Sequence, residues 1–505
     1  MAIVIGAAVL VVGALVAGGL WYAGWPGLRR DSTITASTLF ELLKLVFSVV
    51  AGVGGVAALV VAYRRQRVAE HANELAEFAH RLAHAADHRA EAAESRAKIE
   101  TDRNGIRLFN ERFAKASEQL GSDKAAVRLA GVYAMAGLAD DWRDGRQTCI
   151  DVLCAYLRMP YAPPPEGPSE VPPPVHDVLP MTPADVAQIA REEREVRNTV
   201  IRLIGKRLRP SEVDATSWRG FDFDLTGAVL EGGDLSDAIF SGGVVSFEGA
   251  TFSGGRMSFE GATFSGGRVT FDRATFTHGA VSFDAATFSG GNVSFAGARF
   301  GGGRVSFDEA TFSSGRVSFA WTRFSGGGRV TFDEATFSGG RVSFGGATFL
   351  GGDISFGTSA FSGGRVDFSG ATFADGEVSF DRSTFSGADV SFERVTFSGA
   401  VVVSFFTATF GGGRVSFGGA TFMGGDISFG TSAFSGGRVD FINATFSGGD
   451  VSFGMAVFSG GDVSFERVAF SGGRVFFGSA QLDVPPKFDH WSGGRPPEGL
   501  HLAPA

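Results

Sequence analysis

The chain has 505 residues, more than one ordinary hydrophobic core holds and enough for two or three domains. It contains 73 Gly and 50 Phe but only 5 Tyr, an imbalance that indicates an internal repeat rather than an ordinary globular domain. Its two cysteines exclude a disulfide framework, and its formal net charge of -9 argues against a protein that binds nucleic acid.

Two uncharged stretches near the N-terminus predict a transmembrane hairpin over residues 1–63. Residues 2–24 and 45–63 contain no charged side chain, and each is long enough to cross ~30 Å of hydrocarbon at ~1.5 Å per residue. Trp21 and Trp25 close the first span, as interfacial aromatic residues do. The alternative for the first span is a secretory signal peptide, which should begin with basic residues, whereas this chain begins Met-Ala-Ile-Val.

The arginines that flank the two spans predict the topology. The connecting loop contains Arg29 and Arg30, and the second span is followed by Arg64, Arg65 and Arg67. Basic residues favour the cytoplasmic side, and the three arginines after the second span outnumber the two in the loop. Both ends of the hairpin are therefore expected in the cytoplasm. We therefore predict a two-pass protein of a bacterial plasma membrane, with the lipid bilayer as one partner and the C-terminal domains in the cytoplasm.

Beyond the second span the sequence remains helical and predicts a stalk over residues 64–105. Apolar residues at alternating spacings of four and three form a heptad seam. The seam consists of Val68, Ala72, Leu75, Ala79, Leu82 and Ala86. Since such a seam joins helices, we expect a short coiled coil, and with it a homo-oligomer that forms through the stalk.

Three histidines recur at every fourth residue of the stalk: His80, His84 and His88. Side chains at this spacing share one helix face and can bind a metal ion or respond to pH. The alternative is a solvated polar face, which is favoured because neither a cysteine nor a metal-binding motif accompanies the histidines. The sequence therefore predicts no metal and no cofactor, and it keeps these histidines as the only candidates for a metal site.

Residues 106–159 predict a small α-helical domain. One helix is expected over residues 123–139, with Ser122 as its N-cap. Its expected buried stripe is Val127, Ala130, Ala134 and Leu138, and that of the next helix is Ile150, Leu153, Cys154 and Leu157. Cys154 is thus expected to be a buried thiol rather than a nucleophile. A Pro-rich linker should follow at 160–181, and then a helix at 182–210 that packs on this domain or caps the repeat.

The sequence of the helical region is similar to that of a known family. The stretches that carry the likeness run from Arg112 to Ala134 and from Cys149 to Arg158. They resemble the helical region of actinobacterial membrane-anchored pentapeptide-repeat proteins, and the resemblance covers roughly residues 40–210 and the repeat that follows. It implies an architecture, and it brings no catalytic residue with it.

The repeat begins as ordinary pentapeptides and then changes its period. Leu225, Leu230, Leu235 and Phe240 are five residues apart, and after them Phe recurs at alternating spacings of five and seven up to Phe477. Single-residue insertions interrupt the pattern at residues 326–328 and 401–403. In Val-Ser-Phe and Ala-Thr-Phe the apolar residues point to one side and Ser or Thr to the other, and Ser-Gly-Gly supplies a corner.

The fold class predicted for residues 211–483 is all-β, a right-handed quadrilateral β-solenoid of pentapeptide-repeat type. A coil of about 12 residues would crowd two Phe rings between two short strands, whereas a coil of about 24 residues places one Phe on each of four faces. We therefore expect about eleven coils in a rod ~50 Å long. Residues 484–505 should form a C-terminal cap and tail, with Pro485 and Pro486 stopping strand pairing.

The outer surface of the rod suggests its function. Between residues 221 and 483 there are 26 acidic residues, 16 Arg and no Lys, arranged in acidic and basic columns. We expect a membrane-anchored protein-interaction scaffold that presents the rod to an unknown protein partner. The alternative is an acidic rod that mimics DNA and acts on a DNA-binding enzyme such as gyrase, as some pentapeptide-repeat proteins do. Ladders of Ser and Thr would also suit ice binding, but charged residues flank them.

Catalysis is the least expected function. The repeat contains one histidine, His278, and neither Cys nor Lys. Its Gly-Gly pairs lie at corners and do not form a phosphate-binding loop. The sequence therefore predicts that the protein is not an enzyme and has no catalytic residue.

Overall fold

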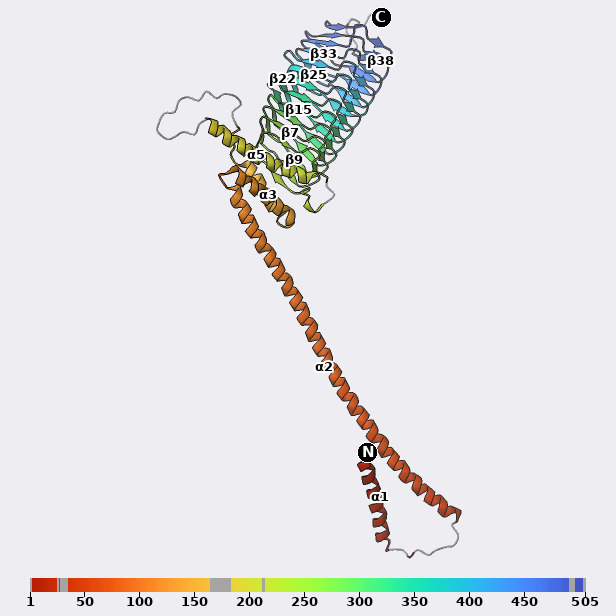
Figure 1. Cartoon of the computed structure of the whole chain (residues 1–505). Helices are drawn as coiled ribbons and strands as arrows, with labels where there is room; N and C mark the ends of the chain where they lie inside the picture. Colours follow the sequence, from red (N-terminus) through yellow and green to blue (C-terminus); the bar gives the residue numbers. More distant parts are fainter. Residues whose placement is uncertain are drawn as a thin grey trace. The chain divides into compact units, whose positions relative to one another are not determined.

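The computed structural model describes residues 2–24, 27, 35–163, 183–210, 214–489 and 496–502 (Figure 1). They form two compact units, Met1–Ile106 and Arg107–Ala505. Trp25, Arg29 and Arg30 and most of the predicted linker at 160–181 lie outside the described residues, as do residues 490–495 and 503–505 of the predicted tail.

The first unit contains helix α1, Ala2–Tyr22, and most of helix α2, Ala36–Leu120. Residues 56–104 of α2 contain neither Gly nor Pro and are rich in Ala, Glu and Arg, which explains an uninterrupted helix of 85 residues. Within the described part of the chain, α2 is the one helix long and apolar enough to cross a membrane. The apolar part of α1, Val9–Tyr22, is shorter.

In the second unit, helices α3, Ala125–Asp141, α4, Arg146–Arg158, and α5, Pro183–Leu208, pack with the end of α2. The predicted stripe of α4 is confirmed, since its apolar residues are fully buried. The predicted stripe of α3 is wrong in part: Leu138 is buried as predicted, but Ala130 and Ala134 are exposed, while Val132 and Met135 are buried.

A close contact between helices explains why α3 buries a different side from the one predicted. A Cβ on Gly131 would lie 2.7 Å from the backbone nitrogen of Leu120, so the glycine side of α3 must face the end of α2. The predicted N-cap is also wrong, because α3 begins at Ala125 with Lys124 in the cap position. The hydroxyl of Ser122 instead accepts a hydrogen bond from the Lys124 amide at 3.2 Å.

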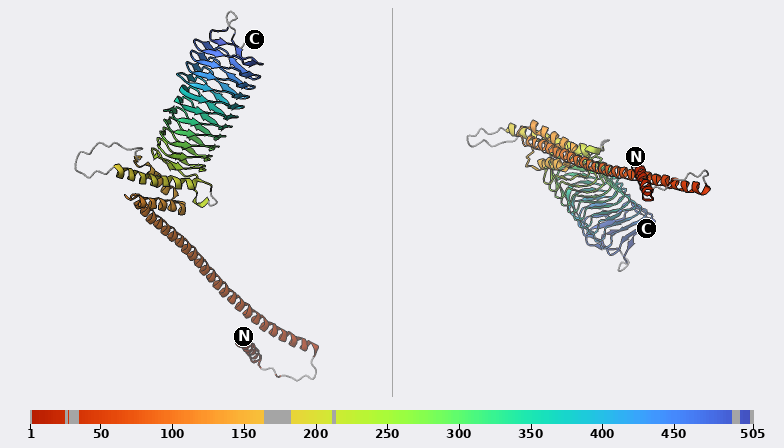
Figure 2. Two further views of the ribbon diagram at one scale, coloured as in Figure 1. Left: turned by 45° about the horizontal axis from the view of Figure 1, so that its top comes forward. Right: turned by 90° about the horizontal axis from the view of Figure 1, so that it is seen from below.

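After the short helix η1, Asp214–Thr216, the chain winds into a rod whose coils have four faces (Figure 2). Face 1 consists of β1 Phe223–Asp224, β5 Val244–Ser246, β9 Arg268–Thr270, β13 Asn292–Ser294, β17 Arg316–Ser318, β21 Arg341–Ser343, β24 Arg365–Asp367, β27 Asp389–Ser391, β31 Arg414–Ser416, β35 Arg438–Asp440, β39 Asp462–Phe465 and β43 Lys487–Phe488. Face 3 consists of β3 Gly233–Asp234, β7 Arg256–Ser258, β11 Ala280–Ser282, β15 Arg304–Ser306, β19 Arg329–Thr331, the ends of β22 Thr348–Ser355 and β25 Thr372–Ser379, β29 Val402–Ser404, β33 Asp426–Ser428, β37 Asp450–Ser452, β41 Arg474–Phe476 and β44 Leu500–His501.

Faces 2 and 4 are built from shorter strands. Face 2 consists of β2 Val229–Leu230, β6 Thr251–Phe252, β10 Thr275–Phe276, β14 Arg299–Phe300, β18 Arg323–Ser325, the starts of β22 and β25, β28 Thr396–Phe397, β32 Thr421–Phe422, β36 Thr445–Phe446 and β40 Ala469–Phe470. Face 4 consists of β4 Ile239–Phe240, β8 Thr263–Phe264, β12 Thr287–Phe288, β16 Thr311–Phe312, β20 Thr336–Phe337, β23 Ala360–Phe361, β26 Thr384–Phe385, β30 Thr409–Phe410, β34 Ala433–Phe434, β38 Val457–Phe458 and β42 Gln481–Leu482.

Strand pairing confirms the longer of the two coil lengths. Val293 of face 1 pairs in parallel with Val317, the equivalent valine of the next coil, so each strand is bonded to the same face of its neighbour. About eleven such coils are present, as predicted, and the shorter coil is excluded. The insertion at 326–328 is absorbed in a corner, since Arg304 still pairs with Arg329.

The interior of the rod is filled by phenylalanine, as predicted from the spacing. Phe344 of face 1 is fully buried and stacks on Phe319 and Phe368 of the adjacent coils, with ring centroids 4.8 and 4.6 Å away. Phe332 and Phe356 of face 3 meet it edge to face at 5.7 and 5.8 Å. Rings of opposite faces therefore interlock across the core, which leaves little room for an internal ligand.

Strand pairing does not end at Pro485 and Pro486, so that prediction was wrong. The two prolines lie in the corner between β42 and β43, and Ser464 pairs with Lys487 beyond them. A corner requires few backbone N–H donors, so it accepts proline, which lacks one.

Two glycines of one coil allow the close stacking of corners to be tested. Gly364 (φ +70°) and Gly370 (φ +67°) are both left-handed, but a Cβ on Gly364 would lie 2.6 Å from the carbonyl carbon of Gly339, while a Cβ on Gly370 would meet nothing within 4 Å. Gly370→Ala should cost about 1 kcal/mol of unfolding free energy through backbone strain alone. Gly364→Ala should cost roughly 3 kcal/mol, because the clash with the preceding corner is added. Equal losses in guanidinium titrations of the two variants would contradict this account of the corners.

Candidate functional site

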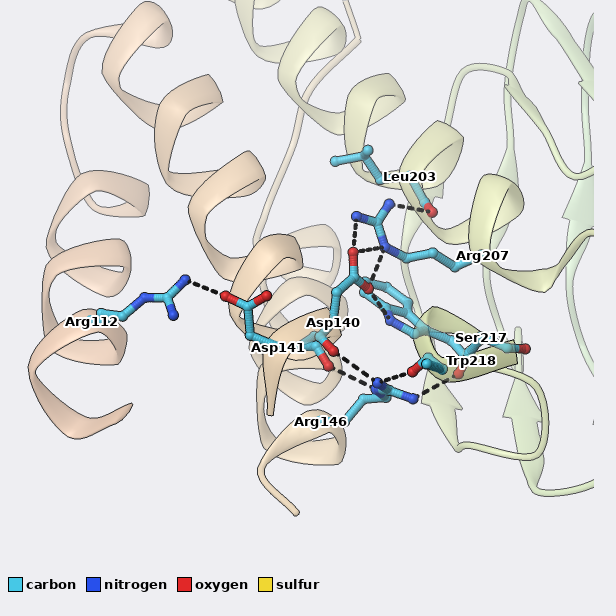
Figure 3. Close-up of polar contacts among 10 residues, drawn as sticks. Arg112, Asp140, Asp141, Arg146, Leu203, Arg207, Ser217 and Trp218 are labelled. Atoms are coloured by element: carbon cyan, nitrogen blue, oxygen red, sulfur yellow. Dashed lines mark hydrogen bonds and ion pairs between the residues drawn. The ribbon is translucent and has the colours of Figure 1, made fainter. Parts of the chain in front are cut away.

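A buried polar joint connects the helical domain to the first coil (Figure 3). The carboxylate of Asp140, at the end of α3, accepts hydrogen bonds from Arg207 of α5 through Nε at 2.8 Å and Nη2 at 2.6 Å. It also accepts one from Nε1 of Trp218 at 3.0 Å, and the Trp218 ring is fully buried beneath the Arg207 guanidinium. One carboxylate therefore joins α3, α5 and the segment that enters the rod.

Arg146 of α4 provides a second connection at the same place. Its guanidinium is almost completely buried and donates to the carbonyl oxygens of Ala139, Asp140, Ala215 and Ser217 at 2.7, 3.1, 2.6 and 2.9 Å. Burial lowers the pKa of Arg146, and the Asp140 carboxylate opposes that shift. Because its four acceptors lie at the end of α3 and in the segment that enters the rod, Arg146 ties the helical domain to the rod.

Face 3 carries most of the acidity of the rod. Each strand is counted together with the turn that follows it. The acidic residues of this face are Asp234, Asp237, Glu260, Asp284, Asp308, Glu309, Asp333, Glu334, Asp353, Glu377, Asp381, Asp426 and Asp450. Its basic residues are Arg256, Arg304, Arg329, Arg382 and Arg474. These 13 acids and 5 arginines give face 3 a net charge of -8. The 26 acids and 16 arginines of residues 221–483 give a net charge of -10, so face 3 carries most of it.

The residue that opens each strand of face 3 forms a column along the rod. In the second half of the rod this column is acidic: Asp353 pairs with Glu377, and beyond Val402 it continues with Asp426 and Asp450. Because the strands are in register, the charges repeat once per coil. We call these five residues the acidic column.

The same position on face 1 is basic in the middle of the rod. Arg316 pairs with Arg341, and Arg341 pairs with Arg365, each one coil further along. All three side chains are exposed. We call these three residues the basic column. Faces 1 and 3 are opposite sides of the four-sided coil, so the two columns lie back to back.

Large apolar side chains are exposed near both columns. Val402, within the acidic column, is 44% exposed, and Phe406 of the same coil is 47% exposed. Trp321, in the turn after face 1, is 76% exposed and lies over Gly346 of the next coil. Such side chains are typical of surfaces that contact another protein.

The histidines proposed for a metal site lie on one exposed side of α2. The ring centroids of His80 and His84 are 4.7 Å apart, those of His84 and His88 are 6.2 Å apart, and His88 lies 3.6 Å from a Glu91 oxygen. Among the described residues, no group of three or more His, Cys, Asp or Glu side chains is placed to hold a metal ion. The solvated polar face stays the prediction for these histidines, and a metal site stays its alternative.

The two cysteines do not provide a reactive thiol. Both are buried, and burial raises the pKa of Cys149 to about 11 and that of Cys154 to about 12. Thiols with such pKa values are protonated near neutral pH, and the thiolate is the nucleophilic form. The expectation of a buried, structural Cys154 is confirmed.

Sequence reasoning missed the joint around Asp140 and the assignment of charges to faces. The partners of Asp140 are 67 and 78 residues away along the chain, and no local motif indicates them. The assignment of charges to faces could have been predicted from the sequence. Once the longer coil is chosen, each spacing of five plus seven residues covers half a coil. Successive Val-Ser-Phe strands therefore lie on opposite faces.

The comparisons with known proteins concern the solenoid. Residues 225–275 match the sequence model of the family described as pentapeptide repeats (9 copies). No curated protein matches the chain. A similar solved structure is HetL, a pentapeptide repeat protein involved in heterocyst differentiation regulation from the cyanobacterium Nostoc sp. strain PCC 7120, with 10% identity over 52% of this chain and 86% of that chain, at a TM-score of 0.19.

A second similar structure is QnrB1, a plasmid-mediated fluoroquinolone resistance protein, with 13% identity over 43% of this chain and 91% of that chain, at a TM-score of 0.12. The match over 225–275, together with buried Leu and Phe at the repeat positions, supports the pentapeptide-repeat family for the solenoid of this chain.

Proposed function

We propose that the protein is a membrane-anchored scaffold, without catalytic activity, that presents the rod to a protein partner. The observation that carries the proposal is the sorting of surface charge: the acidity is concentrated on face 3 of a rod whose interior is filled with side chains. A rigid surface whose charges are held in register from coil to coil suits recognition of another extended surface, since little conformational entropy is lost when it binds.

The anchor in this proposal is the pair α1 and α2. The apolar start of α2 supports it, as do Val11, Val12, Leu45 and Val49, which line one apolar hollow between the two helices. We place both helices in a bacterial plasma membrane, with the stalk as a coiled coil and the rod in the cytoplasm, as in the actinobacterial membrane-anchored proteins that the helical region resembles.

The test is capture of partners from native membranes by the full-length chain. Asp353→Asn, Glu377→Gln and Asp426→Asn together remove three charges of face 3. The matched control removes three exposed acids elsewhere, through Asp389→Asn, Glu466→Gln and Asp483→Asn. We expect the first variant to lose partners that the control retains. The same partners with both variants would mean that face 3 is not the binding surface.

The net charge of face 3 also favours a second candidate, an acidic rod that mimics DNA and acts on an enzyme such as gyrase. The basic column on the opposite face argues against it, because duplex DNA presents negative charge on all sides. A supercoiling assay with purified gyrase separates the candidates. Unchanged supercoiling at a large molar excess of the full-length protein would remove this one.

A further inference from the structure

The basic and acidic columns share one repeat, and each contains neighbours of like charge. Adjacent strands are ~4.8 Å apart, so Arg316, Arg341 and Arg365 follow one another at that spacing, and so do Asp353 and Glu377. Like charges that face each other across paired strands are unfavourable. The fold thus accepts a repulsion at the middle of both faces.

Cross-strand neighbours of opposite sign occur only at the ends of these rows, where Arg329 pairs with Asp353 and Asp389 pairs with Arg365. Among the described residues, none of the three arginines of the basic column lies within 4 Å of a carboxylate oxygen, and neither Asp353 nor Glu377 lies within that distance of a cation. Nearer the C-terminal end of the rod the charges are neutralised internally: Asp450, the last residue of the acidic column, pairs with Arg474 at 2.5 Å, and Arg414 of face 1 pairs with Asp440 at 3.2 Å. The centres of faces 1 and 3 therefore each present a short row of like charges that, among the described residues, form no ion pair within the chain.

We propose that the partner of the rod is a second copy of this chain, with the basic column on face 1 of one rod docked on the acidic column on face 3 of the other. This inference rests on the proposed function and names the partner. A second rod has by construction the same coil repeat, so two of its successive carboxylates, Asp353 and Glu377, can meet two successive arginines while Val402 lies opposite the third position.

The exposed apolar residues fit the same contact. Val402 lies inside the acidic column, where a docked rod would cover it, and Phe406 follows in the same coil. Trp321 lies in the turn that follows the strand of Arg316, beside the basic column. Burial of these side chains adds apolar contact to a surface that is otherwise held by ion pairs.

Charge exchange tests the pairing in the full-length, detergent-solubilised protein. Arg316→Glu, Arg341→Glu and Arg365→Glu reverse the basic column, and Asp353→Arg, Glu377→Arg and Asp426→Arg reverse the acidic column. Each variant alone should associate at least roughly tenfold more weakly than the natural chain. A mixture of the two should regain association, and so should one chain that carries both reversals, which also controls for folding.

The stalk is identical in all of these variants, so association through the stalk cannot produce the pattern. Undiminished association of each single reversal overturns the inference, and so does a mixture that stays as weak as its components. If partner capture depends on face 3 while the rods do not associate, the scaffold stands and only the second copy is ruled out.

A zero-length crosslink locates the contact. Residues 221–483 contain no lysine, so Arg341→Lys places a single amine in that stretch. Carbodiimide treatment should join this amine to Asp353, Glu377 or Asp426 of another copy, as read by peptide mass spectrometry. Arg299→Lys, on the exposed surface of face 2, is the matched control and should give no such product. Equal yields from the two variants would contradict the proposed docking.

Discussion

Replacement of Phe344 by alanine is expected to lower the unfolding free energy of the rod by about 3–5 kcal/mol. The ring is fully buried, stacked at 4.8 and 4.6 Å on the rings of the adjacent coils and in edge contact with two rings of face 3. Alanine removes all four contacts. Since the surrounding rings are held by their own coils, they cannot move in to fill the cavity.

The loss should be local before it is global, because each coil contacts only its neighbours. Hydrogen exchange should accelerate first in residues 319–368, while the first and last coils keep their protection. Phe406→Ala is the control, since that ring is 47% exposed, and it should cost about 1 kcal/mol or less. Similar costs for the two variants would show that the rings do not form the core.

The second large effect is expected at the joint between the helical domain and the rod. Asp140→Ala should cost about 3–5 kcal/mol, because it leaves the Arg207 guanidinium partly buried without its carboxylate and the Trp218 N–H without an acceptor. Denaturant unfolding followed by hydrogen exchange of the first coil measures the change. Protection of residues 223–240 should fall, while protection in the middle of the rod stays.

The adjacent residue provides a matched control for this prediction. Asp141 also pairs with an arginine, Arg112, at 2.8 Å, but the two side chains are 58% and 43% exposed. An exposed pair of this kind contributes at most about 1 kcal/mol. Asp141→Ala should therefore have a small effect, and a loss as large as that of Asp140→Ala would refute the special role of the partly buried Asp140 carboxylate.

The solenoid could be predicted from the sequence because a single residue type, Phe, recurs at its period. The spacing of Phe at five and seven, together with the space that the rings need, leads to the longer, four-faced coil. The pairing of Val293 with Val317 confirms it. The helices were predictable only in part, since the orientation of α3 depends on the contact of Gly131 with Leu120, which no periodicity encodes.

The surface was harder to predict than the core. The acids and arginines were visible as columns, but the columns were not assigned to faces, and the basic and acidic columns lie on opposite faces. A charge on the outside of a coil has no packing requirement that reveals its position. The contacts of Asp140 were hidden for a different reason, since they form only when distant segments come together.

The single-residue insertions at 326–328 and 401–403 have a consequence for how such a chain can change over generations. Each makes its coil one residue longer, yet the strands beyond it return to the same pairing, as Arg304 with Arg329 and Glu377 with Val402 show. The tip at Gly327 has free space around it. A loop of new sequence can therefore be inserted at the tip of Gly327, and whole coils can be duplicated, while the stack of rings stays intact.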